Sequence, residues 1–137
     1  MQTKIRSREL IWALATLLIL FGCGRGGQLA DEAPEIQIAI SLDPDPPRFG
    51  RPCQLTVTVL EADGVVIDGA QLEIKGDMTH AGMVPVVVSV SGGEEGNYTT
   101  GFEWTMAGDW ILTVQAELPD GRIARRQFEI AVGIPGG

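Results

Sequence analysis

From residue 35 onward, hydrophobic and polar residues alternate along the chain in short runs. Residues 70–78 show the clearest case, with polar or charged side chains between the hydrophobic ones. The hydrophobic positions there are Ala70, Leu72, Ile74 and Met78. Side chains two residues apart point to the same face of a β-strand, so this period predicts a strand with one buried face. Six further runs have the same period: 35–43, 53–60, 84–90, 97–105, 109–118 and 122–132.

Turn-forming residues separate these runs, as in ADG, SGGEEGN and PDG. Seven short strands spaced in this way over about 100 residues predict an all-β, immunoglobulin-like sandwich of antiparallel strands. No run has a helical period longer than one turn. We therefore expect one domain of residues 35–132, followed by a tail of residues 133–137. Pro85 has no amide hydrogen, so the run 84–90 is expected to begin at a sheet edge or a bulge.

The two aromatic runs, 97–105 and 109–118, suggest a hairpin with a specific register. Residues on paired strands must point to the same face, and a three-residue loop of Met106, Ala107 and Gly108 satisfies this rule. The predicted pairs are Trp104 with Trp110, Phe102 with Leu112, Thr100 with Val114 and Tyr98 with Ala116. Gly108 then takes the last loop position, which favours a left-handed residue.

Successive antiparallel strands run in opposite directions, so every second connection lies at the same end of a sandwich. The third-to-fourth connection carries His80 and Met83 just after Met78, and the fifth-to-sixth carries Met106. These connections are expected at one end, together with the proline-rich segment 43–52. The sequence thus predicts that the only histidine and three of the four methionines lie together.

Thioether sulfurs and an imidazole are soft donors that suit Cu(I), whereas a zinc site normally uses several His, Cys or carboxylate ligands. Met78, His80, Met83 and Met106 are therefore candidate metal ligands, with Trp104 and Trp110 as walls that shield the ion. An alternative interpretation remains open. Methionine commonly fills irregular gaps at the end of a core, and His80 is then an exposed loop residue.

Residues 1–22 have the pattern of an export signal. Lys4, Arg6 and Arg8 precede a hydrophobic run that is short for a membrane span. The segment LFGC, ending at Cys23, resembles a bacterial lipobox, which implies lipidation of Cys23 and a bacterial cell envelope location, facing the periplasm or the cell surface. The alternatives are an uncleaved anchor or an ordinary signal with a chance cysteine. Residues 24–34 are glycine-rich and polar, as in a flexible tether.

Charge and cysteine content narrow the function further. The chain has a net charge of −8, and loss of residues 1–22, with three positive charges and one negative, makes it −10. An acidic domain without clustered basic residues is a poor nucleic-acid binder. The pair Arg125 and Arg126 is expected to lie on a solvated strand face. If Cys23 carries lipid, Cys53 has no disulfide partner, and its phase with Leu55 favours a core position.

Three segments resemble the YtkA-like and FixH-like domain families of exported or membrane-anchored bacterial proteins. They are FGRPCQLTVTVLEADG, DMTHAGMVPV and GNYTTGFEWTMAGDWILTV, and the resemblance covers about residues 35–132. It implies an immunoglobulin-like fold and an association with copper handling or with assembly of copper-containing oxidases. FixH-type proteins usually have a transmembrane anchor, and the lipobox of this chain departs from that pattern.

These observations favour a non-enzymatic, lipid-anchored envelope protein that binds Cu(I) and acts in copper handling or as an accessory module. Its expected partners are the membrane and an envelope protein, such as a metal transporter or an oxidase-assembly factor. The alternative is a protein-interaction module without metal, in which the Met/His loop is structural. An enzyme is not expected, because no Ser or Cys nucleophile is placed with His80.

Overall fold

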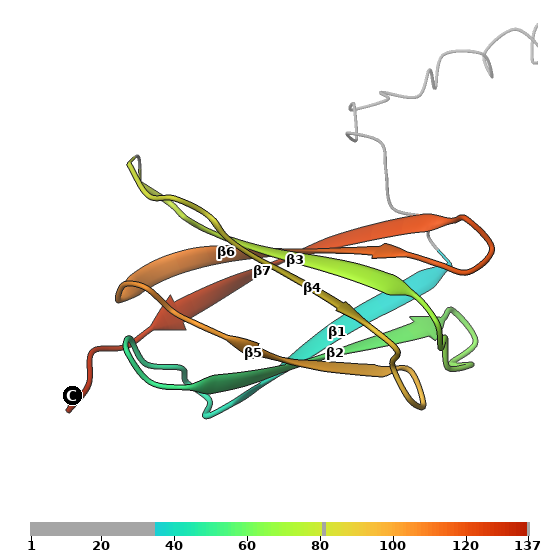
Figure 1. Cartoon of the computed structure of the whole chain (residues 1–137), viewed down its shortest axis with the longest axis horizontal. Helices are drawn as coiled ribbons and strands as arrows, with labels where there is room; N and C mark the ends of the chain where they lie inside the picture. The colour runs from blue at the N-terminus through green and yellow to red at the C-terminus, as the bar shows by residue number, and fades with distance from the viewer. Residues whose placement is uncertain (1–34, 81, 137) are drawn as a thin grey trace, which may run out of the picture. The chain divides into compact units, whose positions relative to one another are not determined.

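The structure, a computed structural model, describes residues 35–80 and 82–136. These residues form two antiparallel sheets (Figure 1). The three-stranded sheet has the order β1-β2-β5 and contains β1 (Ile36–Asp43), β2 (Cys53–Glu61) and β5 (Asn97–Phe102). The four-stranded sheet has the order β4-β3-β6-β7 and contains β4 (Val86–Ser91), β3 (Gln71–Met78), β6 (Gly108–Glu117) and β7 (Ile123–Val132). The predicted all-β, immunoglobulin-like sandwich is confirmed.

The predicted signal peptide, Cys23 and the tether lie outside the described residues. Within the described ranges, no helix is long and apolar enough to cross a membrane.

The alternating hydrophobic positions are buried between the two sheets, as the sequence predicts. Leu55 and Val57 on β2, Ile74 on β3 and Leu112 on β6 have no exposed surface. Burial of each such side chain stabilises the fold by about 1.5–3 kcal/mol. Cys53 is also buried and is a free thiol, which confirms the expectation that it belongs to the core.

The partners of β5 and β6 differ from the predicted hairpin. β5 pairs with β2, so that Tyr98 lies opposite Val57, and β6 pairs with β3 and β7. Trp104 and Trp110 are not cross-strand partners, and the same holds for the three other predicted pairs: Phe102 with Leu112, Thr100 with Val114 and Tyr98 with Ala116. The register prediction was wrong because two strands in facing sheets also direct their hydrophobic sides toward each other. The alternation identifies the buried face of a strand and leaves its partner undetermined.

Residues 103–107 accordingly connect one sheet to the other, and Gly108 is the first residue of β6. Its φ of 127° is positive, as predicted, although the predicted place in a hairpin loop was wrong.

Connections at the two ends of the sandwich differ in composition. The β1–β2, β3–β4 and β5–β6 connections (residues 44–52, 79–85 and 103–107) lie at one end, on the left of Figure 1, which we call the methionine end. Gly133, just after β7, donates to the Pro47 carbonyl and accepts from the Phe49 amide there. The β2–β3, β4–β5 and β6–β7 connections (residues 62–70, 92–96 and 118–122) form the opposite end, which we call the acidic end. The predicted grouping of the methionine-bearing connections is confirmed.

Arg122 organises the acidic end. Its guanidinium donates to both carboxylate oxygens of Glu61, to Asp120 over 2.7 Å, and lies 3.5 Å from Glu35. Hydrogen bonds to Glu61, and then to Asp120, raise the pKa of Arg122. The backbone amide and side chain of Arg122 both donate to Asp120 and lower the pKa of that carboxyl group. The described chain therefore begins, at Glu35, beside a charged network far from the methionine-bearing connections.

Arg126 was expected on a solvated strand face, but its side chain also makes specific contacts with β1 and with Phe128. Its position is in phase with Ala124 and Phe128, the inward side of β7. The guanidinium donates to the Ile38 carbonyl on β1 over 3.1 Å and lies over the Phe128 ring. Arg126 thus links the two sheets along their β1 and β7 edges, whereas exposed Arg125 donates to Gln115 on the outer face, as expected.

Candidate functional site at the methionine end

Met78 is the buried member of the predicted ligand set. It is the last residue of β3, is 9% exposed and lies opposite Trp110 in the β3–β6 register. Its Cε atom would be only 2.9 Å from a Cβ atom on Gly108. The thioether end of Met78 therefore reaches the start of β6, two residues after Met106.

The two indoles form a buried wall at this end. Trp104 and Trp110 have no exposed surface, and their rings meet edge to face with centroids 5.4 Å apart. The Phe102 ring lies 4.7 Å from Trp104. Contact between the two indoles thus arises across the sandwich rather than along one sheet.

Hydrogen bonds tie the β5–β6 connection to these elements. The Trp110 indole N–H donates to the Met106 carbonyl over 3.1 Å, and the Thr79 amide donates to the Asp109 carbonyl over 3.3 Å. These two bonds hold the Met106 backbone at the edge of the Trp110 ring and the start of the β3–β4 connection against β6. The Trp104 indole N–H is buried and has no hydrogen-bond partner among the described residues.

The other candidate ligands lie nearer the surface. His80 is exposed in the β3–β4 connection, Met83 is half-buried against the core, and Met106 is 45% exposed in the β5–β6 connection. The structure therefore brings Met78 against Gly108, two residues after Met106, and His80 lies two residues beyond Met78. Whether the four side chains share one ion stays a prediction.

The candidate metal ligands at this end are soft donor groups. Among residues 35–80 and 82–136, no group of three or more His, Cys, Asp and Glu side chains is placed to hold a metal ion. The donors that are present, three thioethers and one imidazole, fit Cu(I) in kind, since thioether sulfur and imidazole nitrogen suit this ion.

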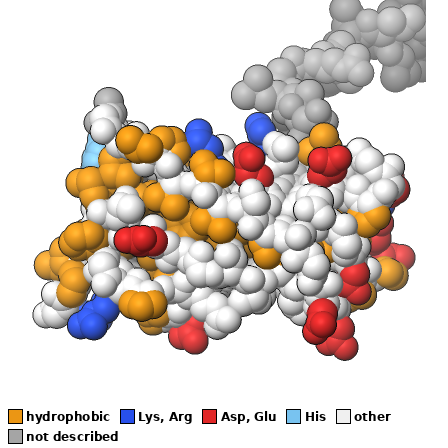
Figure 2. Space-filling view, viewed as in Figure 1, with side chains coloured by type: hydrophobic (Ala, Val, Ile, Leu, Met, Phe, Trp, Pro, Cys, Tyr) orange, Lys and Arg blue, Asp and Glu red, His pale blue; other side chains and the backbone are white. Residues whose placement is uncertain are grey.

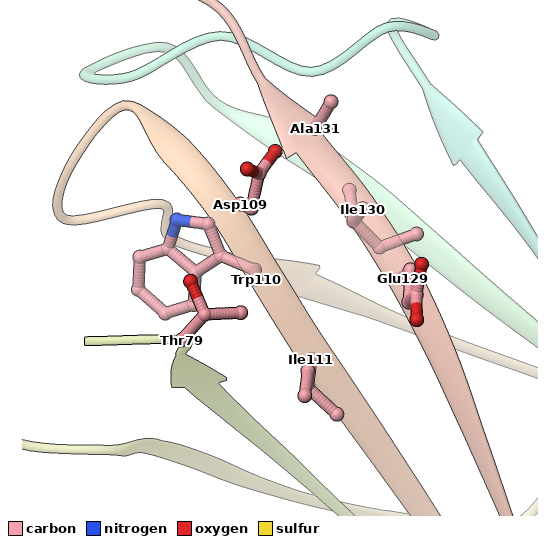
Figure 3. A pocket seen from close by; sticks show the side chains of 7 residues that line it. All are labelled: Thr79, Asp109, Trp110, Ile111, Glu129, Ile130 and Ala131. Carbon is pink, nitrogen blue, oxygen red and sulfur yellow. The ribbon is translucent and has the colours of Figure 1, made fainter.

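Sequence analysis missed a hollow on the outer face of the four-stranded sheet. It has a volume of about 410 Å³ and is lined by Thr79, just after β3, and by residues of β6 and β7 near the methionine end (Figure 3). Asp109 and Glu129 contribute carboxylates from neighbouring strands, and Ile111 lies opposite Glu129 in register. Alternation alone places Asp109 and Ile111 on an outward face. The PDG turn joins these two strands into a hairpin, but no register was assigned to that hairpin from the sequence, so Glu129 was not placed beside them.

A second hollow of about 410 Å³ lies beside Cys53, lined by residues 50–53 and 101–103. Cys53 is 4% exposed there and pairs with Phe102 in the β2–β5 register. Its burial agrees with a packing role for the thiol.

Comparison with known proteins places the chain in a family. It belongs to the YtkA-like family, whose model matches residues 31–115. This match confirms the YtkA-like resemblance of the sequence segments. No curated protein matches the chain.

Among solved structures, a superoxide reductase (neelaredoxin) from Ignicoccus hospitalis is 14% identical with a TM-score of 0.52, covering 72% of this chain and 82% of that chain. At this identity the likeness shows a shared fold alone. The PmoD soluble domain from a Methylocystis species is 14% identical with a TM-score of 0.45, covering 77% of this chain and 95% of that chain. This second likeness is too weak to carry an argument.

Proposed function

We propose that this YtkA-like protein is a non-enzymatic lipoprotein of the bacterial cell envelope that binds Cu(I) at its methionine end and acts as an accessory module in copper handling. One observation carries the proposal. The Met78 thioether lies against the start of β6, immediately beyond the connection that bears Met106, and His80 follows Met78 by two residues. Soft donors from β3, from the β3–β4 connection and from the β5–β6 connection thereby lie at the same end of the sandwich.

Each residue has a distinct part in the proposed site. Met78 would supply a thioether from the end of β3. His80 and Met83 would supply an imidazole and a second thioether from the β3–β4 connection, and Met106 would supply a third thioether from the β5–β6 connection. These few, soft ligands would favour the reduced ion, and the buried Trp104 and Trp110 rings would shield it from water on the core side.

A lipid at Cys23 would attach the protein at the acidic end, since the described chain begins there at Glu35. The methionine end would then point away from the point of attachment. That orientation suits exchange of Cu(I) with an envelope partner such as a metal transporter or an oxidase-assembly factor.

A Cu(I) titration of the full chain against a chromophoric competitor tests the proposal. A variant with Met78→Leu, Met83→Leu, Met106→Leu and His80→Gln removes all four donors while keeping side-chain volume. We expect its Cu(I) affinity to fall at least about a hundredfold, because each lost soft ligand weakens binding. Val84→Ala in the same connection is the matched control and should bind as the wild type does. Equal competition by the wild type and the four-donor variant would refute Cu(I) binding here.

Exposed hydrophobic side chains at the methionine end favour a second candidate function, a protein-interaction module without metal. Phe49, Val84, Met106 and Ile134 are 42%, 82%, 45% and 65% exposed. Figure 2 shows hydrophobic side chains gathered on the left, with most of the visible Asp and Glu on the right. Exposed hydrophobic patches commonly mark contact surfaces. Crosslinking in cells distinguishes the two functions: capture of one partner irrespective of copper supply favours the interaction module.

A further inference from the structure

β4 is an edge strand of unusual composition. Among the strands of residues 35–80 and 82–136 it pairs only with β3, and its sequence VVVSVS has no charge, no proline and no glycine. The β3–β4 register runs without a bulge from Gln71 opposite Ser91 to Gly76 opposite Val86. Within the part of the chain that the structure describes, residues 86–91 make no backbone hydrogen bond beyond those to β3. One side of β4 therefore presents N–H and C=O groups that can pair with another strand.

The other three edge strands carry features that oppose such pairing. β7 contains the charged residues Arg125, Arg126 and Glu129. On the β1 edge, the Ile38 carbonyl already accepts a hydrogen bond from the Arg126 guanidinium. β1 ends at Asp43 and is followed at once by proline. β5 includes Gly101, which weakens a strand, and is mainly polar. Charges and breaks of this kind are what natural proteins use to block edge-to-edge association.

We propose that β4 pairs with β4 of a second copy of this chain, antiparallel, joining the two four-stranded sheets into one. Paired residues must point to the same face, so the sum of their numbers must be even. A twofold axis at Val88 meets this condition: Val88 faces its own copy, Val86 faces Val90, and Val87 faces Ser89. Each inward valine of one copy then lies beside an inward valine of the other. This holds whether the outward backbone groups of β4 belong to the even-numbered or to the odd-numbered residues.

The distribution of charge favours a second copy as the occupant. Glu94 and Glu95 follow β4 at the acidic end, while Met83 and Val84 precede it at the methionine end. Antiparallel pairing places the acidic end of one copy beside the methionine end of the other, so that the two acidic ends stay apart. Pairing also covers Val87, which is 53% exposed in a single copy.

The oligomeric state of the full chain, purified in a mild detergent, tests this inference. Sedimentation equilibrium over a range of protein concentrations should show a reversible dimer. Val87→Lys places a charge on the outward face of β4, opposite Ser89 of the second copy and diagonal to the same substitution in that copy. We expect it to weaken dimerisation at least about tenfold without unfolding the domain, because like charges near one another on paired strands destabilise the pairing.

Val65→Lys is the matched control, because Val65 is 57% exposed in the β2–β3 connection, at the other end of the sandwich. It should dimerise as the wild type does. Mixed copies carrying Val87→Cys and Ser89→Cys should form a disulfide-linked dimer under mild oxidation, in agreement with the register. A wild type that remains monomeric at all concentrations, or a dimer that Val87→Lys leaves intact, would overturn the proposal.

Discussion

At the residue scale, Gly76 makes room for the aromatic cluster beneath the methionine end. A Cβ atom at this position would lie 2.7 Å from Cζ of Phe102 and 3.3 Å from the Trp110 ring. Both rings belong to the buried cluster and have little freedom to move. The closest of these contacts is shorter than real Cβ contacts, so a larger side chain at position 76 must displace a ring.

We therefore predict that Gly76→Ala lowers the free energy of unfolding by about 1–3 kcal/mol, the usual cost of overpacking a core. Urea denaturation followed by tryptophan fluorescence measures the change. Gly101→Ala is the control, because Gly101 also lies in a strand and nothing is within 4 Å of its Cβ position. If both variants have the same stability, the close approach of Phe102 to β3 is wrong.

Tyr98 is a second residue with a structural role, because its hydroxyl group holds the β2–β3 connection. It donates to the Ile67 carbonyl over 2.7 Å and accepts from the Ala70 amide over 3.0 Å, and both bonds are buried. Tyr98→Phe leaves these two backbone groups without a partner. We predict a loss of about 1–3 kcal/mol in unfolding free energy, together with faster hydrogen exchange of the Ala70 amide. An unchanged exchange rate at Ala70 would show that another group satisfies this amide.

At the element scale, the strands were predictable and their pairing was not. Period-two alternation identified all seven strands, and on β3 it also identified the buried face, which includes Leu72 and Ile74. Alternation is local, whereas the choice between hairpin and facing sheets for β5 and β6 depends on contacts between residues far apart in sequence. The same limit explains why the candidate ligands could be placed at one end, while the approach of Met78 to Gly108 and the 45% exposure of Met106 emerged only from the structure.

The β6–β7 turn contributes to the stability of the fold in a pH-dependent way. The pKa of Asp120 is lowered in the folded state, chiefly by the Arg122 amide and then by its side chain. A lowered carboxyl pKa contributes stability that is fully present above the unfolded value, near pH 4, and is lost as the pH falls through the folded value.

We predict that Asp120→Asn loses less stability than the wild type between about pH 5 and pH 2, because the variant has no carboxylate to protonate. The effect is expected to be small, since Asp120 is exposed and solvent screens its charge. Thermal unfolding across this pH range measures it. Glu117→Gln, which changes a carboxylate outside the ion pairs of Arg122 with Glu35, Glu61 and Asp120, is the control and should follow the wild-type profile.

At the scale of the whole molecule, the two ends of the sandwich have different chemistry. Glu61, Asp120 and Arg122 surround the entry of the described chain at the acidic end, and exposed hydrophobic side chains occupy the other end. An attachment to the membrane through residues before Glu35 would therefore hold the protein by its acidic end. The predicted lipid on Cys23, outside the described residues, would supply such an attachment, and more than one acyl chain would make it stable.

Replacement of this cysteine tests the attachment directly. We predict that Cys23→Ala leaves the precursor unprocessed or releases the domain from the membrane fraction, because the thiol that receives the lipid is gone. Membrane fractionation combined with metabolic labelling by a fatty acid measures both outcomes. Cys53→Ala is the matched control, since Cys53 is a buried core thiol and its removal should leave lipid labelling unchanged. If Cys23→Ala remains membrane-bound and labelled with lipid, the anchor lies elsewhere, and the proposed attachment at the acidic end loses its basis.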